Sequence, residues 1–431
     1  MDPVRKAIED ALRGIRELGT PEELEADAQV GRQIPAAKAN AHIHLPPNFS
    51  AFNSVRQAVE LSAGQGLRVL GGSNYYDFSV YAELAAECRS HQIFPLFGLE
   101  VIALLDDMAA ADILINDPGN PGKMYLCGKG IVRFNPMTRT ARELMTRMRR
   151  SDSLRMRWMI RRMEEIFASC GAETGLTAES ISSRIAQRSH AVKSTVCLQE
   201  RHVAQAFQEA LFELFPPEER EKRLTTIYGT RPKAHADDRV GTQNEIRSQL
   251  MKKGKRAFVP ESFVDFSDAC RLILELGGIP CYPTLADGTT PICAYEDPPE
   301  KLVDMLLANR VYCAEFIPIR NKPEVLERYV RSARTAGLVI TAGTEHNTLD
   351  LIPMEPSCIG GTPVPDKIKE IFWEGACVVA AHQFLRLHGR CGYVDDSGDL
   401  NPAFPDRQQR IDYFRSLGAA VIARYDEQYS R

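Results

Sequence analysis

The segment Asn40-Ala41-His42-Ile43-His44-Leu45-Pro46-Pro47-Asn48 predicts a short buried strand that runs out into a loop. Because successive side chains on a strand point to opposite faces, His42 and His44 project to the same side of it. The two prolines end the strand, since proline cannot supply the N–H that a sheet requires. The histidine pair is therefore expected at the carboxyl end of a strand, where α/β enzymes place their chemistry.

Two imidazoles at this spacing can bind Zn, Mn or Fe. They can equally be two hydrogen-bonded histidines at a strand end. Ligands from other strand ends would favour the metal site.

Strands alternate with helices after this segment. The apolar pattern predicts helices at 54–63 and 79–90 and strands at 67–72 and 93–105. This alternation indicates βα units and a parallel sheet or barrel. The strand 93–105 carries Glu100, and a charge inside an apolar strand needs a partner. A metal ion or a buried salt bridge would provide one, and a solvent-facing edge would remove the need.

The next strand, near 124–131, is flanked by glycines and contains Lys129. Glycine lets backbone approach a ligand closely, so Lys129 is a candidate for holding an anion. A solvated loop lysine is the alternative.

The alternation of strands and helices stops near Asn135, and a largely helical stretch follows. Between Arg139 and Arg162 there are nine arginines and two acids. An apolar stripe of methionines, with Trp158, makes this a basic amphipathic helix. It is either a lid or interface for an anionic ligand, or a solvated basic face over a packed stripe. A second helix begins near Gln199 and carries Arg201 and His202.

The alternation of strands and helices resumes with a strand at 278–283. A further strand at 311–318, a helix at 323–336 and a strand at 338–342 follow, and the last strand ends in Glu345 and His346. Helices are predicted at 366–387 and 406–425. At the start of the chain, residues 3–18 predict an amphipathic helix.

Composition indicates a soluble globular protein. The chain has 431 residues, of which 44% are hydrophobic and 26% charged. Its formal net charge of -4 argues against a dedicated nucleic-acid binder. Eleven dispersed cysteines favour reduced thiols in a cytoplasm. Neither a signal peptide nor an apolar run of about eighteen residues is present, so we expect a cytoplasmic protein.

The length predicts more than one ordinary core. We expect an N-terminal helical segment (1–37), a first barrel part (38–134), a helical insertion (135–265), a second barrel part (266–350) and a C-terminal helical region (351–431).

In this order the motifs resemble the PHP (polymerase and histidinol phosphatase) family. The resemblance rests on the His-x-His of the first strand, the Gly-x-Glu of the third, an Arg-x-His-like helix start after an insertion, and the late Gly-Thr-acid-His loop. It covers roughly residues 38–350. It implies a distorted (β/α)7 TIM-like barrel with metals at the carboxyl ends of the strands, hydrolysing phosphoesters.

Residue by residue, the resemblance implies metal ligands at His42, His44, Glu100, His202 and Glu345. The family's second motif, an Asp-His pair, falls on Asn74 and Tyr75, and its Ala-His-Pro motif on Cys281, Tyr282 and Pro283. The family's final histidine falls on Asn347, one residue after His346, and a further histidine falls near Tyr125 or Leu126. These departures leave room for one or two divalent ions rather than three.

For function we expect a metal-dependent hydrolase, a phosphoesterase of a small or sugar-like, anionic phosphate. A metal-activated water would attack the substrate, Lys129 and Arg201 would stabilise phosphoryl charge, and Tyr75, Tyr282 or His346 would donate a proton. Two alternatives stay open: a degenerate barrel serving as a non-catalytic binding module, and a metal-dependent hydrolase or lyase of an unphosphorylated substrate. A homo-oligomer is compatible with the sequence.

Overall fold

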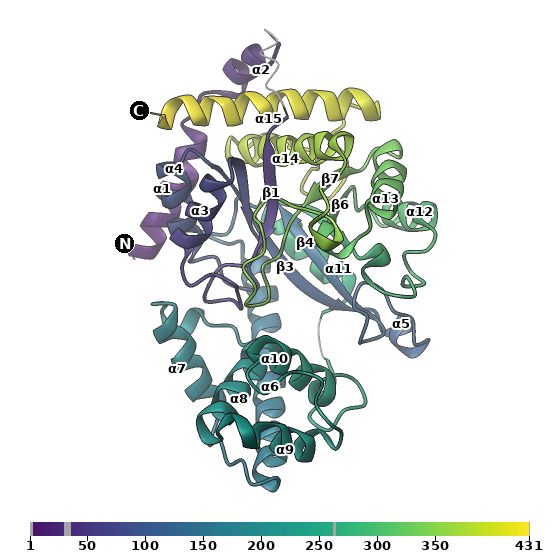
Figure 1. Cartoon of the computed structure of the whole chain (residues 1–431). Helices are drawn as coiled ribbons and strands as arrows, with labels where there is room; N and C mark the ends of the chain where they lie inside the picture. Colours follow the sequence, from purple (N-terminus) through teal and green to yellow (C-terminus); the bar gives the residue numbers. More distant parts are fainter. Residues whose placement is uncertain (1–2, 30–35, 262–263, 431) are drawn as a thin grey trace.

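The computed structural model describes residues 3–29, 36–261 and 264–430 (Figure 1). Two helices, α1 (Pro3–Arg16) and α2 (Pro21–Gln29), precede a seven-stranded barrel. Figure 1 shows the barrel in the upper part of the molecule and a group of helices below it.

The barrel strands follow one another in sequence order around the sheet. They are β1 (Lys38–Ile43), β2 (Leu67–Gly72), β3 (Phe94–Leu104), β4 (Lys123–Lys129), β5 (Ile279–Thr284), β6 (Cys313–Phe316) and β7 (Val339–Ala342). Strand β4 is antiparallel to both of its neighbours, and the other pairs are parallel. The antiparallel strand makes this a distorted form of the (β/α) barrel.

The barrel nearly closes between β7 and β1. The N–H groups of Thr344 and Glu345 donate to the carbonyl of His42, at 3.1 and 2.9 Å. The N–H of His44 donates to the carbonyl of Glu345, at 2.9 Å. These bonds join the loop after β7 to the histidine strand, so both line the same end of the barrel.

Helices cover the barrel between its strands. They are α3 (Val55–Gly64), α4 (Tyr81–Ser90), α5 (Asp106–Ala110), α11 (Phe266–Glu275), α12 (Pro299–Ala308) and α13 (Pro323–Thr335). Two long helices, α14 (Asp366–Leu387) and α15 (Arg407–Tyr429), lie across the top of the barrel in Figure 1. Gly375 allows α14 to approach β7, because a Cβ there would lie 2.0 Å from the carbonyl oxygen of Ile340.

The lower helices are α6 (Arg139–Ser169), α7 (Ala178–Arg188), α8 (Glu200–Leu214), α9 (Pro217–Tyr228) and α10 (Arg239–Ile246), with a π-helical turn at Arg247–Met251. The hydroxyl of Thr138 caps α6 by accepting the N–H of Ala141. These helices bury a hydrophobic core of their own, separate from the barrel core. They lie at the carboxyl end of the parallel strands (Figure 1).

The expected stripe on α6 needs one correction. Met156, Met159 and Met163 are buried, as their spacing predicts, but Trp158 is 45% exposed. Successive side chains on a helix are about 100° apart, so Trp158 lies about 160° from Met156 but only about 60° from Arg161, whose guanidinium packs over its ring. Trp158 therefore belongs to the basic outer face.

The structure confirms the predicted fold class, an α/β barrel of seven strands with a mostly helical insertion. The expected strand 67–72 coincides with β2, and the expected strand 93–105 is β3 with one residue fewer at each end. Among the described residues, no helix combines the length and apolar composition that crossing a bilayer requires.

Candidate active site

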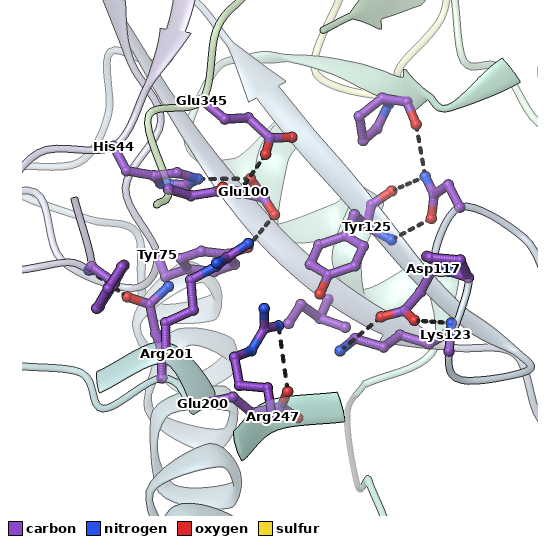
Figure 2. Close-up of a pocket in the computed structure, with 18 of the residues that line it drawn as sticks. His44, Tyr75, Glu100, Asp117, Lys123, Tyr125, Glu200, Arg201, Arg247 and Glu345 are labelled. Atoms are coloured by element: carbon purple, nitrogen blue, oxygen red, sulfur yellow. Dashed lines mark hydrogen bonds and ion pairs between the residues drawn. The ribbon is translucent and has the colours of Figure 1, made fainter. Parts of the chain in front are cut away.

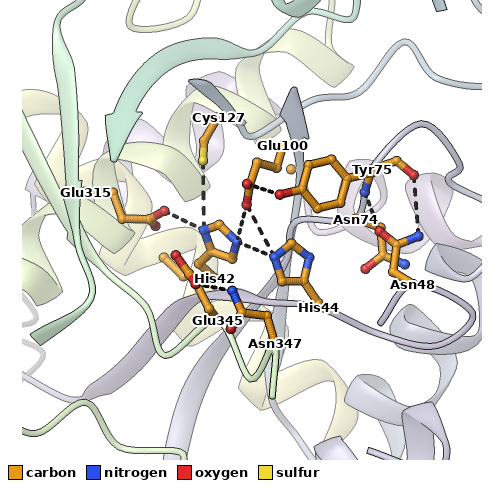
Figure 3. A network of polar contacts seen from close by, with 12 residues as sticks. His42, His44, Asn48, Asn74, Tyr75, Glu100, Cys127, Glu315, Glu345 and Asn347 are labelled. Carbon is orange, nitrogen blue, oxygen red and sulfur yellow. Dashed lines mark hydrogen bonds and ion pairs between the residues drawn. The ribbon is translucent and has the colours of Figure 1, made fainter. Parts of the chain in front are cut away.

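Three side chains meet where the carboxyl end of β1 lies near the middle of β3 (Figure 3). The Nε2 atoms of His42 and His44 are 3.4 Å apart. Glu100 Oε2 lies 3.2 Å from the first and 3.3 Å from the second. Tetrahedral ligands at zinc bond lengths lie about 3.3–3.6 Å from one another. The three atoms of this His–His–Glu triad therefore have the mutual spacing of ligands to one metal ion.

The hydrogen bonding of His42 supports that interpretation. Its Nδ1 lies 2.6 Å from Glu315 Oε2, and a carboxylate accepts, so Nδ1–H donates. In the neutral tautomer Nε2 then carries a lone pair that faces the Glu100 carboxylate. Two facing acceptors repel unless a cation or a second proton lies between them. The donor set thus fits a divalent ion.

Without a metal ion, a proton is the alternative. Burial opposes a charged imidazole at His42, but the Glu315 carboxylate outweighs it and raises the pKa of His42 well above its usual value. Burial likewise opposes a charged Glu100, but hydrogen bonds from His42 and His44 hold the pKa of that carboxyl well below its usual range. The surroundings of the triad therefore stabilise a positive charge between its members.

Glu315, on β6, is itself held in place. Lys129 forms a buried ion pair with it, and Lys129 Nζ also donates to the carbonyl of Ala41 at 3.1 Å. Although burial raises it, Lys129 and His42 bring the pKa of Glu315 down to about 2. A carboxylate that orients a metal-binding histidine is a common supporting arrangement in metalloproteins. Lys129 therefore acts on His42 through Glu315, and it does not line the cavity.

Tyr75 supports the other two members of the triad. Its hydroxyl donates to Glu100 Oε1. Its ring stacks on His44, with the ring centres 5.3 Å apart and 7° between the planes. The side chain of the adjacent Asn74 is hydrogen-bonded to the backbone of Leu45. Its Oδ1 accepts the Leu45 N–H, and its Nδ2 donates to the Leu45 carbonyl, each at 2.8 Å.

Cys127 is a fourth candidate ligand. Its Sγ lies 3.9 Å from His42 Nδ1. With His42 and Glu100 it forms a group whose ligand atoms all lie within 4.8 Å of one another. Burial raises the pKa of the Cys127 thiol to about 12, so it is protonated without a metal.

Glu345 lies next to the triad but has a cationic partner. Arg320 Nη1 donates to its Oε1 at 3.0 Å, and Arg320 Nη2 and Asn347 reach its other oxygen. The carboxylate lines the cavity and is neutralised there. No local pattern in the sequence predicts that Arg320, from the loop after β6, contacts Glu345.

Three other predicted site residues lie apart from the triad. His202 Nδ1 accepts the N–H of Gln199 at 3.1 Å, and its ring packs on Phe49; burial lowers its pKa to about 3. The Tyr282 hydroxyl donates to Glu296 at 2.9 Å, because alternation on β5 turns it into the core outside the barrel. Both ring nitrogens of His346 are hydrogen-bonded, Nδ1 to Thr344 Oγ1 at 2.7 Å and Nε2 to the carbonyl of Ile352 at 2.9 Å. None of the three lines the cavity.

The triad opens into a cavity of about 460 Å³ between the barrel and the lower helices (Figure 2). Barrel residues that line it include His44, Tyr75, Glu100, Tyr125, Arg320 and Glu345. The helices contribute Asp152, Arg155, Glu200, Arg201, Arg247 and Lys252. The lower helices thus cover the carboxyl end of the barrel and supply part of the site.

Arg201, at the start of α8, is distinctive in this wall. Its side chain is half-buried and forms no hydrogen bond or ion pair with any residue that the structure describes. Burial and the neighbouring Arg247 lower the pKa of Arg201 to about 9. An anionic ligand in the cavity would relieve this uncompensated charge.

A second ionic cluster joins the barrel to the helices, and we call it the interface network. Lys123 lies 3.3 Å from Asp117 and 3.2 Å from Glu261. Arg155 lies 3.0 Å from Glu261 and 2.7 Å from Glu200. Lys252 lies 2.9 Å from Glu200. Despite burial, Lys252 and Lys123 hold the pKa of Glu200 well below its usual range.

Sequence reasoning missed Glu315 and Cys127. Glu315 lies in an apolar strand, which is the signal that singled out Glu100, and applying the same rule there would have found it. Cys127 had no comparable signal, because its approach to His42 depends on the register of β3 and β4.

Comparison with known proteins gives structural matches alone: no family model and no curated protein matches the sequence. The chain resembles the crystal structure of a "putative metal-dependent phosphoesterase" from Bifidobacterium adolescentis, with a TM-score of 0.52 and 16% identity over 78% of this chain and 96% of that one. It also resembles an amidohydrolase from Chromobacterium violaceum, with a TM-score of 0.48 and 15% identity over 78% and 97% of the two chains. At such identity the first likeness shows a shared fold alone.

Proposed function

We propose that the protein is a metal-dependent hydrolase, a phosphoesterase that acts on a small or sugar-like phosphate. The single observation that carries the proposal is the spacing of the triad, whose three ligand atoms lie 3.2–3.4 Å apart with two acceptors face to face. The resemblance of the motifs to the PHP family adds support.

We propose that His42, His44 and Glu100 hold one ion of Zn, Mn or Fe, a choice that the mixture of imidazole and carboxylate favours. Such an ion, when bound, supplies a Lewis acid that lowers the pKa of water and withdraws charge from a phosphoryl oxygen. Among the described residues, one group of at least three ligating side chains has its ligand atoms within 4.8 Å of one another, and it comprises His42, Glu100 and Cys127. His44 Nε2 lies 3.4 Å from His42 Nε2 and 3.3 Å from Glu100 Oε2 and so belongs to the same cluster. His202 and Glu345, the other predicted ligands, have the partners given above.

The chain's own residues would orient and neutralise the substrate. Glu315 fixes the ring of His42, and Tyr75 fixes the carboxylate of Glu100. Arg201 would pair with the phosphoryl group, because guanidinium matches its geometry and has no acid of its own here. Arg320 already neutralises Glu345, so that carboxylate repels an incoming anion less.

Turnover of a panel of phosphomonoesters and phosphodiesters, with unphosphorylated esters and amides alongside, tests the proposal. We expect the metal-loaded protein to hydrolyse phosphoesters and His42→Ala to be inactive. His91→Ala is the matched control, because its ring bonds the carbonyl of Glu87 outside the cavity. Turnover confined to unphosphorylated substrates would overturn the phosphoesterase assignment while keeping the hydrolase.

One observation favours that second candidate. A guanidinium pairs with a carboxylate as readily as with a phosphate. Arg201 therefore also suits a carboxylate-bearing substrate whose amide or ester bond is cleaved at the same triad. A protein that binds metal and substrate but turns over neither panel would indicate a binding module.

A further inference from the structure

Tyr125 lines the cavity and presents its hydroxyl there. It lies on β4, and the Asn116 side chain clamps its backbone: the Tyr125 N–H donates to Asn116 Oδ1 at 2.8 Å, and Asn116 Nδ2 donates to the Tyr125 carbonyl at 3.0 Å. Figure 2 shows the ring in the middle of the cavity wall, between Glu100 and Lys123. The backbone clamp fixes where the ring projects.

The register of the sheet explains this position. On β3 and β4, Glu100 pairs with Cys127 and Ile102 pairs with Tyr125. Residues two apart on a strand share a face, so Tyr125 lies one step along from the triad on the same side. Further along β4, away from the triad, Lys123 Nζ lies 4.9 Å from the centre of the Tyr125 ring. Tyr125 thus lies between the triad and the interface network.

Its hydroxyl is free for a ligand, unlike those of the neighbouring tyrosines. The hydroxyl of Tyr75 is bound to Glu100, and the hydroxyl of Tyr282 to Glu296. The hydroxyl of Tyr76 has no partner but is enclosed by protein atoms. The hydroxyl of Tyr125 has no hydrogen-bond partner among the described residues and is not enclosed in this way.

We propose that the Tyr125 hydroxyl donates a hydrogen bond to a phosphoryl oxygen of the substrate and stabilises the charge that develops there. The inference rests on the proposed phosphoesterase function. A water oxygen attacks phosphorus, the ester P–O bond breaks, and its electron pair leaves with the alcohol oxygen. That oxygen takes a proton from solvent and the attacking water loses one, so Tyr125 keeps its own proton throughout.

The position makes such a donor effective. Tyr125, Arg201 and Arg320 line the same cavity. Two guanidiniums and one neutral donor would then surround an anion beside the triad. Fixed donors of this kind act most strongly where charge builds in the transition state.

Oxyanion binding by Tyr125→Phe tests the inference. The substitution removes the hydroxyl alone and keeps the ring that packs on Lys123. Calorimetry on the Mn²⁺-loaded protein would compare inorganic phosphate, which resembles the ground state, with vanadate, which adopts the five-coordinate geometry of phosphoryl transfer. We expect vanadate to bind about 10²-fold more weakly to the variant, with a smaller change for phosphate. Tyr329→Phe, whose hydroxyl donates to the carbonyl of Glu296, is the matched control.

The outcomes separate this inference from the proposed function. Unchanged vanadate affinity in the variant, equal losses for both anions, or a wild type that binds neither anion would each overturn the role of Tyr125. A wild type that shows the expected Tyr125-dependent binding but hydrolyses no phosphoester would support the donor role and contradict the phosphoesterase.

Discussion

Two charged clusters adjoin the cavity, and they differ in how their charges are balanced. In the interface network three carboxylates meet three cations, and each has an opposite charge within 3.3 Å. At the triad, Glu100 and Glu315 face two imidazoles, with Lys129 as the one fixed cation. With neutral imidazoles this second cluster has one negative charge in excess.

The difference assigns a separate role to each cluster. Buried charges persist where they are paired, and the interface network is paired within the protein. It therefore needs no ligand, and we interpret it as the contact that holds the lower helices over the barrel. We propose that a cation from outside completes the triad, and we therefore assign the chemistry to the triad.

The largest effect should come from unbalancing the interface network. We expect Glu200→Ala to lower the free energy of unfolding by about 3–5 kcal/mol, because Lys252 and Arg155 each lose a buried ion-pair partner. Denaturant unfolding followed by circular dichroism measures it. Glu209→Ala, on the same helix, removes a more exposed pair with Arg188 and should cost about 1 kcal/mol or less. Equal losses in the two variants would contradict the interpretation.

The next effect concerns Arg201, which has no ion-pair partner among the residues that the structure describes. We expect Arg201→Ala to lower kcat/KM for an anionic substrate by about 10- to 150-fold, since a hydrogen bond to a charged group contributes about 1.5–3 kcal/mol. Steady-state kinetics measures it. Metal content should not change, and Arg201→Lys should retain part of the activity because it keeps the charge but loses the two-pronged geometry. An alanine variant with wild-type kinetics would remove Arg201 from the site.

A smaller effect tests the support of the triad. We expect Tyr75→Phe to weaken metal binding about 10-fold, because Glu100 loses the hydroxyl that orients it. Competition with a chromogenic chelator measures the metal dissociation constant. The neighbouring Tyr76→Phe removes a hydroxyl that has no hydrogen bond and should leave that constant unchanged. A shift of the same size in both variants would show that Tyr75 acts only through packing.

Local patterns predicted the strands and several site residues, whereas long-range partners decided the rest. Alternation of apolar residues located β2 and β3, and the spacing of His42 and His44 together with Glu100 pointed to residues that the structure brings to one point. Their role as metal ligands stays a prediction, as do the domain boundaries and the oligomeric state.

Other roles could not be read from the sequence. Glu345 meets Arg320 and His202 caps its own helix, and both outcomes depend on which side chains tertiary packing brings near. Tyr282 needed knowledge of which face of β5 looks into the barrel. Tyr125 needed the register of an antiparallel strand that the alternation of strands and helices did not predict.

The most direct test of the account is the metal content of the protein purified without chelators, determined by elemental analysis beside His42→Ala. We predict about one equivalent of Zn, Mn or Fe in the wild type and none in the variant, with the circular dichroism spectrum retained. A wild type that stays metal-free after reconstitution, or a variant that keeps the same metal content, would contradict the assignment of the triad.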